Sequence, residues 1–340
     1  MIENANFSFD DVAVISVELH EAPTVVTSDE VDARLEPFYA RTEGKPGLLE
    51  SLAGIRERRQ WPDDVTFTDA AAAAGEKAIA ASGVDRSEIG LMVDTSVCRA
   101  RLEPSSAVTV HDALGLPTTC LNFDVSNACL GFVNAMHLAG VMIDSGQIDY
   151  ALIVDGEGTN QVYDNTINYL NEHGKGIEDI FANFATLTLG SGAAAMVLGR
   201  HTTNPGSHQI LKGFFRAATQ HHQLCVGSLD GMTTDTKALL DAGTELAKLA
   251  WDDAGAGESW GGRDRYILHQ ISEVHTNAML DVLNLDADKV PKTFPFYGNI
   301  GPAAIPITLA HVQDTLSEGD SVLCMGIGSG LNAGVIELRW

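Results

Sequence analysis

The sequence consists of short apolar runs that alternate with longer stretches of helical periodicity, and this alternation occurs twice. Each short run has the length and composition of a buried strand, and each longer stretch has the apolar spacing of a helix. This order favours an α/β fold, with a parallel or mixed sheet covered by helices, and its repetition suggests a duplication. The first series comprises residues 89–93, 129–145 and 150–154, and the second comprises residues 266–268, 305–316 and 321–326.

Local signals predict further elements in the first half. Residues 69–82 are rich in alanine and predict a helix that Thr68 caps and Gly83 ends. Residues 155–185 are polar and irregular in pattern, which predicts a lid or a connection. Residues 187–198 predict a strand–turn–strand unit around their glycines. We expect two units, residues 1–185 and residues 186–340.

The chain is strongly acidic, which limits its partners. It has 340 residues and a formal net charge of −25 at pH 7. Nucleic acids and anionic membrane surfaces bind basic faces, so we expect neither as a partner. Residues 125–143 and 181–199 lack charged side chains, but their small and polar residues favour buried elements over membrane insertion. The N-terminus does not resemble a signal peptide, so we expect a cytoplasmic protein.

Cys129 is the strongest candidate for a reactive residue. It lies in residues 127–132 (NACLGF), between a predicted strand at residues 122–125 and the predicted helix at residues 129–145. The N–H groups and the dipole of a helix N-terminus favour the thiolate, which is the nucleophilic form of cysteine. The alternative is a buried and unreactive side chain, because free cysteine is among the most buried residue types.

His269 and Asn299 are weaker candidates when each is taken alone. His269 follows the apolar run at residues 266–268, at a strand end where α/β folds bind ligands, although it can equally be structural. Asn299 lies between glycines and can form a turn or donate to an oxyanion. A thiol, an imidazole and an amide are together the groups needed for acyl transfer through a thioester. We expect a second oxyanion hole from backbone N–H groups of Cys129, Gly328 and Ser329.

The segments around Cys129, His269 and Asn299 resemble the cysteine, histidine and asparagine segments of the thiolase superfamily, and more narrowly those of its ketoacyl-synthase III branch. Residues 189–194 and 326–332 resemble further segments of that branch. The resemblance implies a homodimer with a duplicated thiolase fold of five layers, α-β-α-β-α. Residues 1–185 would form the half with the nucleophile, and residues 186–340 would form the half with the histidine and the asparagine.

Within that branch, the chain resembles the acyl-CoA-condensing thiolases of long-chain olefin biosynthesis, the OleA type. The resemblance rests on residues 94–97 (DTSV), 102–105 (LEPS) and 155–157 (DGE). It implies that Glu103, 26 residues before Cys129, enters the active site of the partner subunit and removes an α-proton from an acyl group. Without the resemblance, Glu103 would be a surface carboxylate before a proline turn.

The resemblance implies an acyltransferase that joins two fatty acyl-CoA molecules head to head into a 2-alkyl-3-oxoacyl product. Cys129 would carry the first acyl group. The second acyl group would need a positioned base, because no decarboxylation supplies its carbanion. A malonyl-dependent ketoacyl-carrier-protein synthase III, a cysteine hydrolase and an inactive partner subunit are the alternatives. Glu273 replaces a basic residue that meets the carrier protein in initiating synthases, which puts a carrier-protein partner in doubt.

The phosphates of CoA need cationic contacts, which the sequence does not localise well. We expect no cofactor besides the acyl-CoA substrate, and no metal, because His221, His222 and Cys225 lack further ligands at suitable spacing. The acyl chain length is open, as is delivery of the product to enzymes of an olefin, ketone or lactone pathway. The candidates for CoA binding, each of which can also be a solvated surface charge, are Arg56, Arg58, Arg59, Lys212 and Arg216.

Overall fold

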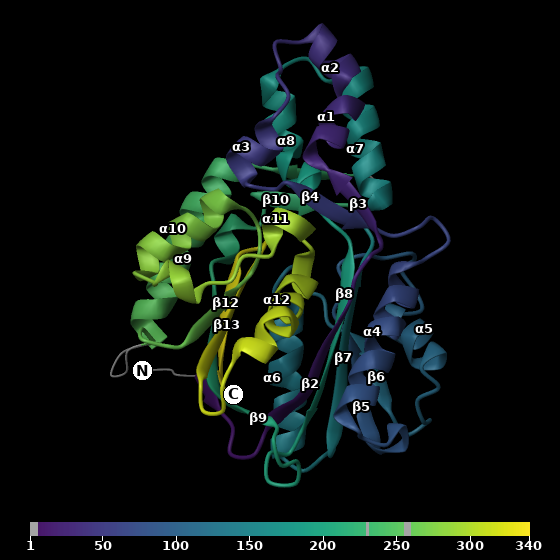
Figure 1. Cartoon of the computed structure of the whole chain (residues 1–340), viewed down its shortest axis with the longest axis vertical. Coiled ribbons are helices and arrows are strands. Elements are labelled where there is room, and N and C mark those ends of the chain that lie inside the picture. The colour runs from purple at the N-terminus through teal and green to yellow at the C-terminus, as the bar shows by residue number, and fades with distance from the viewer. Residues whose placement is uncertain (1–5, 229–230, 255–259) are drawn as a thin grey trace.

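Two sets of strands form the centre of the molecule in the computed structural model, which describes residues 6–228, 231–254 and 260–340 (Figure 1). Their internal order is the same apart from β6, an additional strand in the first set. The first set has the order β6-β5-β7-β8-β2 and the second has the order β12-β13-β14-β9. The first comprises β2 (Ala13–His20), β5 (Ile89–Asp94), β6 (Leu121–Asp124), β7 (Tyr150–Glu157) and β8 (Gly192–Gly199). The second comprises β9 (His208–Ala217), β12 (Arg265–Leu268), β13 (Ser321–Gly328) and β14 (Asn332–Arg339).

The strand pairing repeats from one set to the other. Strand β7 pairs parallel with β5 and antiparallel with β8, and β8 pairs antiparallel with β2. In the same way, β13 pairs parallel with β12 and antiparallel with β14, and β14 pairs antiparallel with β9. A short ladder between β2 and β9 joins the two sets. The repeated pairing agrees with the expected duplication.

Helices form three layers around the two sets (Figure 1). Helices α6 (Gly131–Asp144) and α12 (Ala304–Val312) each contact strands of both sets and therefore form the middle layer. Helix α4 (Phe67–Ser82) packs on β2, β7 and β8, with α5 (Ser106–Ala113) beside it. Helix α9 (Thr236–Ala254) packs on β9 and β14, with α10 (Glu273–Leu283) beside it. The expected five-layer arrangement is confirmed.

The charge-free stretches are core elements, as expected. Helix α6 is largely apolar because strands of both sets pack on it, and Phe132, Val133 and Met136 are fully buried. All residues of β8 are buried as well. None of the described helices is long and apolar enough to cross a membrane.

A helical cap covers one end of the two sets (Figure 1). It contains α1 (Ser28–Arg34), α2 (Glu36–Arg41), α3 (Leu48–Ala53), α7 (Asn160–His173), α8 (Ile177–Leu187) and the hairpin of β3 (Thr24–Thr27) and β4 (Glu57–Gln60). The expectation of an irregular segment at residues 155–185 is therefore wrong. Tyr163, Ile167 and Leu170 follow helical spacing and are buried against Phe38, while the remaining face of α7 is polar.

Two further expectations differ in detail from the structure. Helix α4 begins after Thr66, not Thr68, because the Thr66 side chain accepts a hydrogen bond from the backbone N–H of Asp69 in a reciprocal capping box. Residues 187–198 contain one strand instead of two, since Leu187 ends α8.

The remaining elements are short. They comprise β1 (Asn6–Ser8), which pairs with β9, the hairpin of β10 (Cys225–Gly227) and β11 (Met232–Thr234), the helix α11 (Phe294–Tyr297), and the 3₁₀ turns Arg86–Glu88, Thr219–His221, Ala287–Lys289, Gly301–Ala303 and Gln313–Thr315.

Candidate active site

A cavity of about 1250 Å³ is lined by residues of both halves. Cys129, His269 and Asn299 all line it, although they lie far apart in the sequence. Leu240, Trp251, Met279 and Leu283 from α9 and α10 give the cavity an apolar wall. The three residues that the sequence singles out therefore open into one space large enough for a substrate.

Cys129 lies in the tight turn that connects β6 with α6. Ala128, just before it, has a φ of 45°, which is unusual for a residue with a side chain. Gly328, at the end of β13, packs directly on this turn, and a Cβ at Gly328 would lie 2.8 Å from the backbone oxygen of Asn127. The end of β13 therefore needs glycine where it supports the nucleophile turn.

The Cys129 thiol is protonated at rest, contrary to the expectation from the helix dipole. Burial raises its pKa to about 12, and the nearby Glu157 carboxylate adds to the rise. The helix begins two residues later, at Gly131, and does not offset these two effects. A base must therefore accept the thiol proton before Cys129 can act as a nucleophile.

His269 has the protonation state that such a base needs. It follows β12, and its backbone N–H donates to the Met325 oxygen at 2.9 Å. Burial lowers the pKa of its imidazole to about 3, and the neighbouring His275 contributes to the decrease. The Nδ1 atom is buried and has no hydrogen-bond partner within the described part of the chain. At neutral pH the ring is uncharged and able to accept a proton.

Asn299 is fixed by a close crossing of two segments. Its backbone N–H donates to the Thr188 oxygen at 2.9 Å, and the Gly190 N–H donates to the Asn299 oxygen at 3.0 Å. A Cβ at Gly190 would lie 1.9 Å from the Tyr297 backbone oxygen, so only glycine permits this crossing. The Asn299 Oδ1 atom accepts from the Gly301 N–H at 3.1 Å. The side-chain NH2 group is thus the part of Asn299 that can donate to a substrate oxygen.

Gly328 and Ser329 also line the cavity beside the nucleophile turn. Their placement is compatible with the expected backbone oxyanion hole, whose donors stay a prediction.

Glu103 does not line the cavity of its own chain. It is exposed on the segment between β5 and α5, next to the fully exposed Leu102, whereas residues 97–102 of the same segment do line the cavity. The structure of a single chain therefore contains Cys129, His269 and Asn299 in one space but leaves Glu103 outside it.

The expectation that Arg58 binds CoA is wrong. Its side chain is fully buried in the cap, where the guanidinium donates to Ser28 Oγ at 3.3 Å and to the Leu187 oxygen at 3.4 Å. It also lies 5.9 Å from the ring centre of Tyr163. These contacts make Arg58 a structural residue that a phosphate cannot reach.

The other four cationic candidates do not line the cavity. Arg56 is exposed beside the Phe296 ring, and Arg59 lies between Glu57 and the Tyr297 ring. Lys212 and Arg216 form ion pairs with Glu337 and Asp253. The cations that do line the cavity are Arg99, Arg101 and Lys237.

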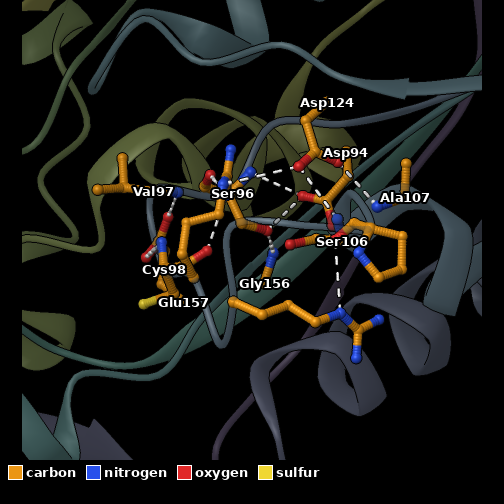
Figure 2. A network of polar contacts seen from close by, with 12 residues as sticks. Asp94, Ser96, Val97, Cys98, Ser106, Ala107, Asp124, Gly156 and Glu157 are labelled. Atoms are coloured by element: carbon orange, nitrogen blue, oxygen red, sulfur yellow. Dashed lines mark hydrogen bonds and ion pairs between the residues drawn. The ribbon is translucent and has the colours of Figure 1, made fainter. Parts of the chain in front are cut away.

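Glu157 was not assigned a role from the sequence. It is the last residue of β7, is buried, and lines the same cavity as Cys129. Burial raises its pKa to about 7. Its carboxylate accepts hydrogen bonds from the backbone N–H groups of Val97 and Cys98 (Figure 2). The signal in the sequence is an acidic DGE segment that directly follows an apolar run, residues 150–154, within the same strand.

His275 was also not singled out. It lines the cavity from the first turn of α10, and its Nδ1 atom lies 3.0 Å from Ser272 Oγ. Burial lowers its pKa to about 4, so the cavity contains two uncharged imidazoles at neutral pH.

Comparisons with known proteins identify the family. The model of the 3-oxoacyl-[acyl-carrier-protein (ACP)] synthase III family matches residues 123–218, and the model of the C-terminal part of that family matches residues 254–340. An acyl-CoA:acyl-CoA alkyltransferase of Xanthomonas campestris pv. campestris is 40% identical over 336 residues, which cover 98% of this chain and 99% of that protein. The chain belongs to the acyl-CoA:acyl-CoA alkyltransferase family.

Further relatives agree with membership in the alkyltransferase family. The alkyltransferase of Shewanella oneidensis is 36% identical over 345 residues, with 97% of this chain and 99% of that protein covered. A crystal structure of Xanthomonas campestris OleA has a TM-score of 0.95 at 40% identity and covers 98% of this chain and 99% of that chain. The beta-ketoacyl-[acyl-carrier-protein] synthase III of Bacillus pumilus is more distant, at 28% identity over 303 residues, with 86% of this chain and 89% of that protein covered.

Crystal structures of the Xanthomonas OleA include one with bound lauric acid and lauroyl-CoA, which has a TM-score of 0.94 and covers 98% of this chain and 100% of that chain. Variants of that OleA were solved with a substituted cysteine and with a substituted glutamate. The two substituted positions are separated by as many residues as Glu103 and Cys129 are here. The expected membership in the thiolase superfamily and the expected fold are both confirmed.

Proposed function

We propose that this chain condenses two long-chain fatty acyl-CoA molecules head to head, without decarboxylation, to a 2-alkyl-3-oxoacyl product. The observation that carries the proposal is the single cavity of about 1250 Å³ in which Cys129, His269 and Asn299 meet an apolar wall. A half-buried thiol, an uncharged imidazole and an amide donor suit acyl transfer. The volume suits fatty chains better than a short acyl group.

In the proposed first step, the Cys129 thiol attacks the carbonyl carbon of one acyl-CoA while His269 accepts the thiol proton. The Asn299 NH2 group stabilises the negative charge that develops on the carbonyl oxygen. When the carbon–sulfur bond to CoA breaks, His269 returns the proton to the CoA thiolate. Cys129 is then acylated, and one CoA thiol is released.

In the second step, a carboxylate removes an α-proton from the second acyl-CoA, and the resulting enolate attacks the acyl-Cys129 thioester. The new carbon–carbon bond forms as the bond to the Cys129 sulfur breaks, which leaves a 2-alkyl-3-oxoacyl-CoA. The proton that the carboxylate took from the α-carbon then passes to the released Cys129 thiolate, so both groups return to their starting states. Hydrolysis of this thioester gives the acid and a second free CoA. The α-hydrogen is weakly acidic, so this step depends on a well-placed base and on stabilisation of the enolate oxygen.

The base in this proposal is Glu103 of the partner subunit, in a homodimer. Two features of the single chain support this assembly. The Leu102 side chain beside Glu103 is fully exposed and is therefore available to pack against a second copy. Strand β6 lies at one end of the strand order, and Leu121 at its start is 49% exposed. An uncovered edge strand with an exposed leucine is suited to pairing with a second copy.

The proposed reaction needs no cofactor besides the acyl-CoA substrates, because the four side chains supply a nucleophile, an acid–base group, an oxyanion donor and a base. All five cysteines are free thiols, which persist in a reducing compartment, so we propose that the protein works in the cytoplasm. Enzymes that convert the 3-oxoacyl product to an olefin or a lactone are the proposed pathway partners.

The proposal is tested by stoichiometry. Purified protein is incubated with a single long-chain acyl-CoA and no malonyl donor, free CoA thiol is titrated, and the extract is analysed by mass spectrometry. We expect two CoA released per condensed product. CoA release with free fatty acid alone would indicate a hydrolase, and activity that begins only when malonyl-CoA or malonyl-carrier protein is added would indicate a ketoacyl synthase III.

A further inference from the structure

The Glu157 carboxylate binds the beginning of the segment that carries Glu103. One oxygen accepts from the Val97 N–H at 2.6 Å, and the other accepts from the Cys98 N–H at 3.3 Å. Glu157 is only 3% exposed, so these hydrogen bonds form away from bulk water. A carboxylate that accepts from two successive backbone N–H groups fixes the direction in which the chain leaves β5.

A second carboxylate binds the end of the same segment. Asp124, the last residue of β6, accepts from the Ser106 N–H at 3.0 Å and from the Ala107 N–H at 2.8 Å (Figure 2). These donors are the first N–H groups of α5, which an acidic side chain stabilises. Arg99 lies 3.6 Å from Asp124 and also donates to the Ser96 and Cys98 oxygens. The segment is therefore anchored on both sides of Glu103.

Ser96, the residue just before the segment, is held by hydrogen bonds to the ends of β5 and β7. Asp94, at the end of β5, accepts from the Ser96 N–H at 2.8 Å and from its hydroxyl group, and Ser96 Oγ accepts from the Gly156 N–H at 2.9 Å. Glu103 itself lies exposed between the anchors at Val97 and Cys98 and those at Ser106 and Ala107. Its position is thus determined by groups that it does not contact.

We infer that Glu157 is a positioning residue for Glu103, an inference that rests on the proposed function. Through Val97 and Cys98, Glu157 determines where the Glu103 carboxylate stands relative to a second acyl group. Loss of Glu157 therefore slows the condensation step but does not slow the acylation of Cys129. Asp124 acts on the same segment from outside the cavity.

A purely structural role of Glu157 would impair the acylation of Cys129 and the condensation step together, whereas a positioning role slows condensation alone. Glu157→Gln retains one oxygen acceptor but places an NH2 donor against the second backbone N–H, so the segment loses one anchor. Asp124→Ala removes the other anchor without changing any residue that lines the cavity. Glu337→Gln is the matched control, because Glu337 is a buried glutamate in β14 that does not line the cavity.

The experiment measures both half-reactions with a long-chain acyl-CoA. Acylation is followed by the first CoA released per subunit and by the intact mass of the acyl-enzyme, and condensation is followed by the 3-oxo product. For Asp124→Ala we expect acylation within about twofold of the unmodified protein, and for Glu157→Gln, which also lowers the pKa of Cys129, acylation that is equally fast or up to several-fold faster. In both variants condensation should be at least about tenfold slower. Glu337→Gln should change neither rate.

A double-mutant comparison tests whether Glu157 acts through Glu103. Adding Glu157→Gln to Glu103→Gln should slow condensation by less than about twofold more, because the positioned group is already gone. Equal losses of acylation and condensation, or additive losses in the double variant, would overturn the inference. If Glu157→Gln does not fold, Asp124→Ala alone and combined with Glu103→Gln decides in the same way.

Failure of the inference can be distinguished from failure of the proposed function. If the unmodified protein forms no 3-oxo product from acyl-CoA alone, or if Glu103→Gln condenses normally, the proposed function or its base is wrong. If Glu103→Gln strongly slows condensation while Glu157→Gln and Asp124→Ala condense at the normal rate, only the positioning role is wrong.

Discussion

The two halves of the molecule share a strand pairing but end their strands in different chemistry. The first half places carboxylates at the ends of β5, β6 and β7, namely Asp94, Asp124, Asp155 and Glu157. In the second half, β12 is followed by uncharged His269, and β13 ends at Gly328. Acidic groups therefore lie near the thiol and anchor the Glu103 segment, whereas the groups that the second half contributes are neutral. Duplication of one fold allows these two environments to share one cavity.

The largest expected effect comes from removing the nucleophile of the first half. Cys129→Ala should lower both CoA release and condensed product by at least about 1000-fold, because no acyl-enzyme can form. Both are measured with a single long-chain acyl-CoA. Cys120→Ala is the control, since Cys120 is a buried cysteine that does not line the cavity. Substantial turnover by Cys129→Ala would rule out the proposed mechanism.

Removing a neutral donor of the second half should have the next largest effect. Asn299→Asp retains the oxygen that accepts from the Gly301 N–H but replaces the NH2 donor with an acceptor. We expect kcat for acylation to fall by about 100- to 1000-fold, the range for loss of one oxyanion-hole donor. An unchanged kcat in steady-state assays would mean that Asn299 only shapes its turn.

Neutralising one acid of the first half should change the reactivity of the thiol. Glu157 raises the pKa of Cys129, so Glu157→Gln lowers that pKa and increases the thiolate fraction at any pH below it. We expect alkylation of Cys129 by iodoacetamide to become several-fold faster at pH 8. Burial remains the larger cause, so the thiol pKa should stay above that of free cysteine. A slower or unchanged rate would contradict the assigned charge effect.

The same acid should make stability depend on pH in a defined direction. Burial raises the pKa of Glu157 from 4.5 to about 7, so its stabilising contribution is complete below pH 4.5 and is lost as pH rises through 7. Relative to Glu157→Gln, the unmodified protein should lose about 2 kcal/mol of unfolding free energy between pH 5 and pH 8. Urea unfolding at both pH values measures this difference, and a constant difference would contradict it.

The buried imidazoles of the second half should make stability fall as the pH decreases, which is the opposite of the effect of Glu157. Burial lowers the pKa of His269 to about 3 and that of His275 to about 4, below the ordinary value of 6.5. Their contribution to stability is complete above pH 6.5 and is lost as pH falls through 4 and 3. The unfolding free energy of His275→Asn minus that of the unmodified protein should therefore be larger at pH 5 than at pH 7. Urea unfolding at pH 5 and pH 7 tests this smaller effect.

From the sequence, the helices and strands that carry the reactive residues can be predicted well, but the environment of each side chain cannot. The segments before Cys129 and His269 are strands, as predicted, and Cys129 and His269 do line one cavity. The thiol pKa was not predictable from the helix position, because it depends on burial and on Glu157 from another strand. The expected division of the chain at residues 185 and 186 stays a prediction.

Long-range contacts explain the remaining differences. Arg58 looks like a surface cation in sequence, but Ser28, Leu187 and Tyr163 enclose it from distant segments. Helix α7 is too polar to stand out in a search for apolar periodicity, because it buries only one narrow face. The sequence shows Glu157 as an acidic residue shortly after an apolar run. Its contacts with Val97 and Cys98, however, exist only in the folded chain.

The claim that a second copy completes the site is tested most directly by mixing two inactive variants. Cys129→Ala has the base but no nucleophile, and Glu103→Gln has the nucleophile but no base. After unfolding and refolding together, about half of the dimers contain one of each, and each such dimer holds one complete site. We predict condensation at about a quarter of the unmodified rate, since one site in four is complete. A mixture as inactive as each variant alone would contradict the account.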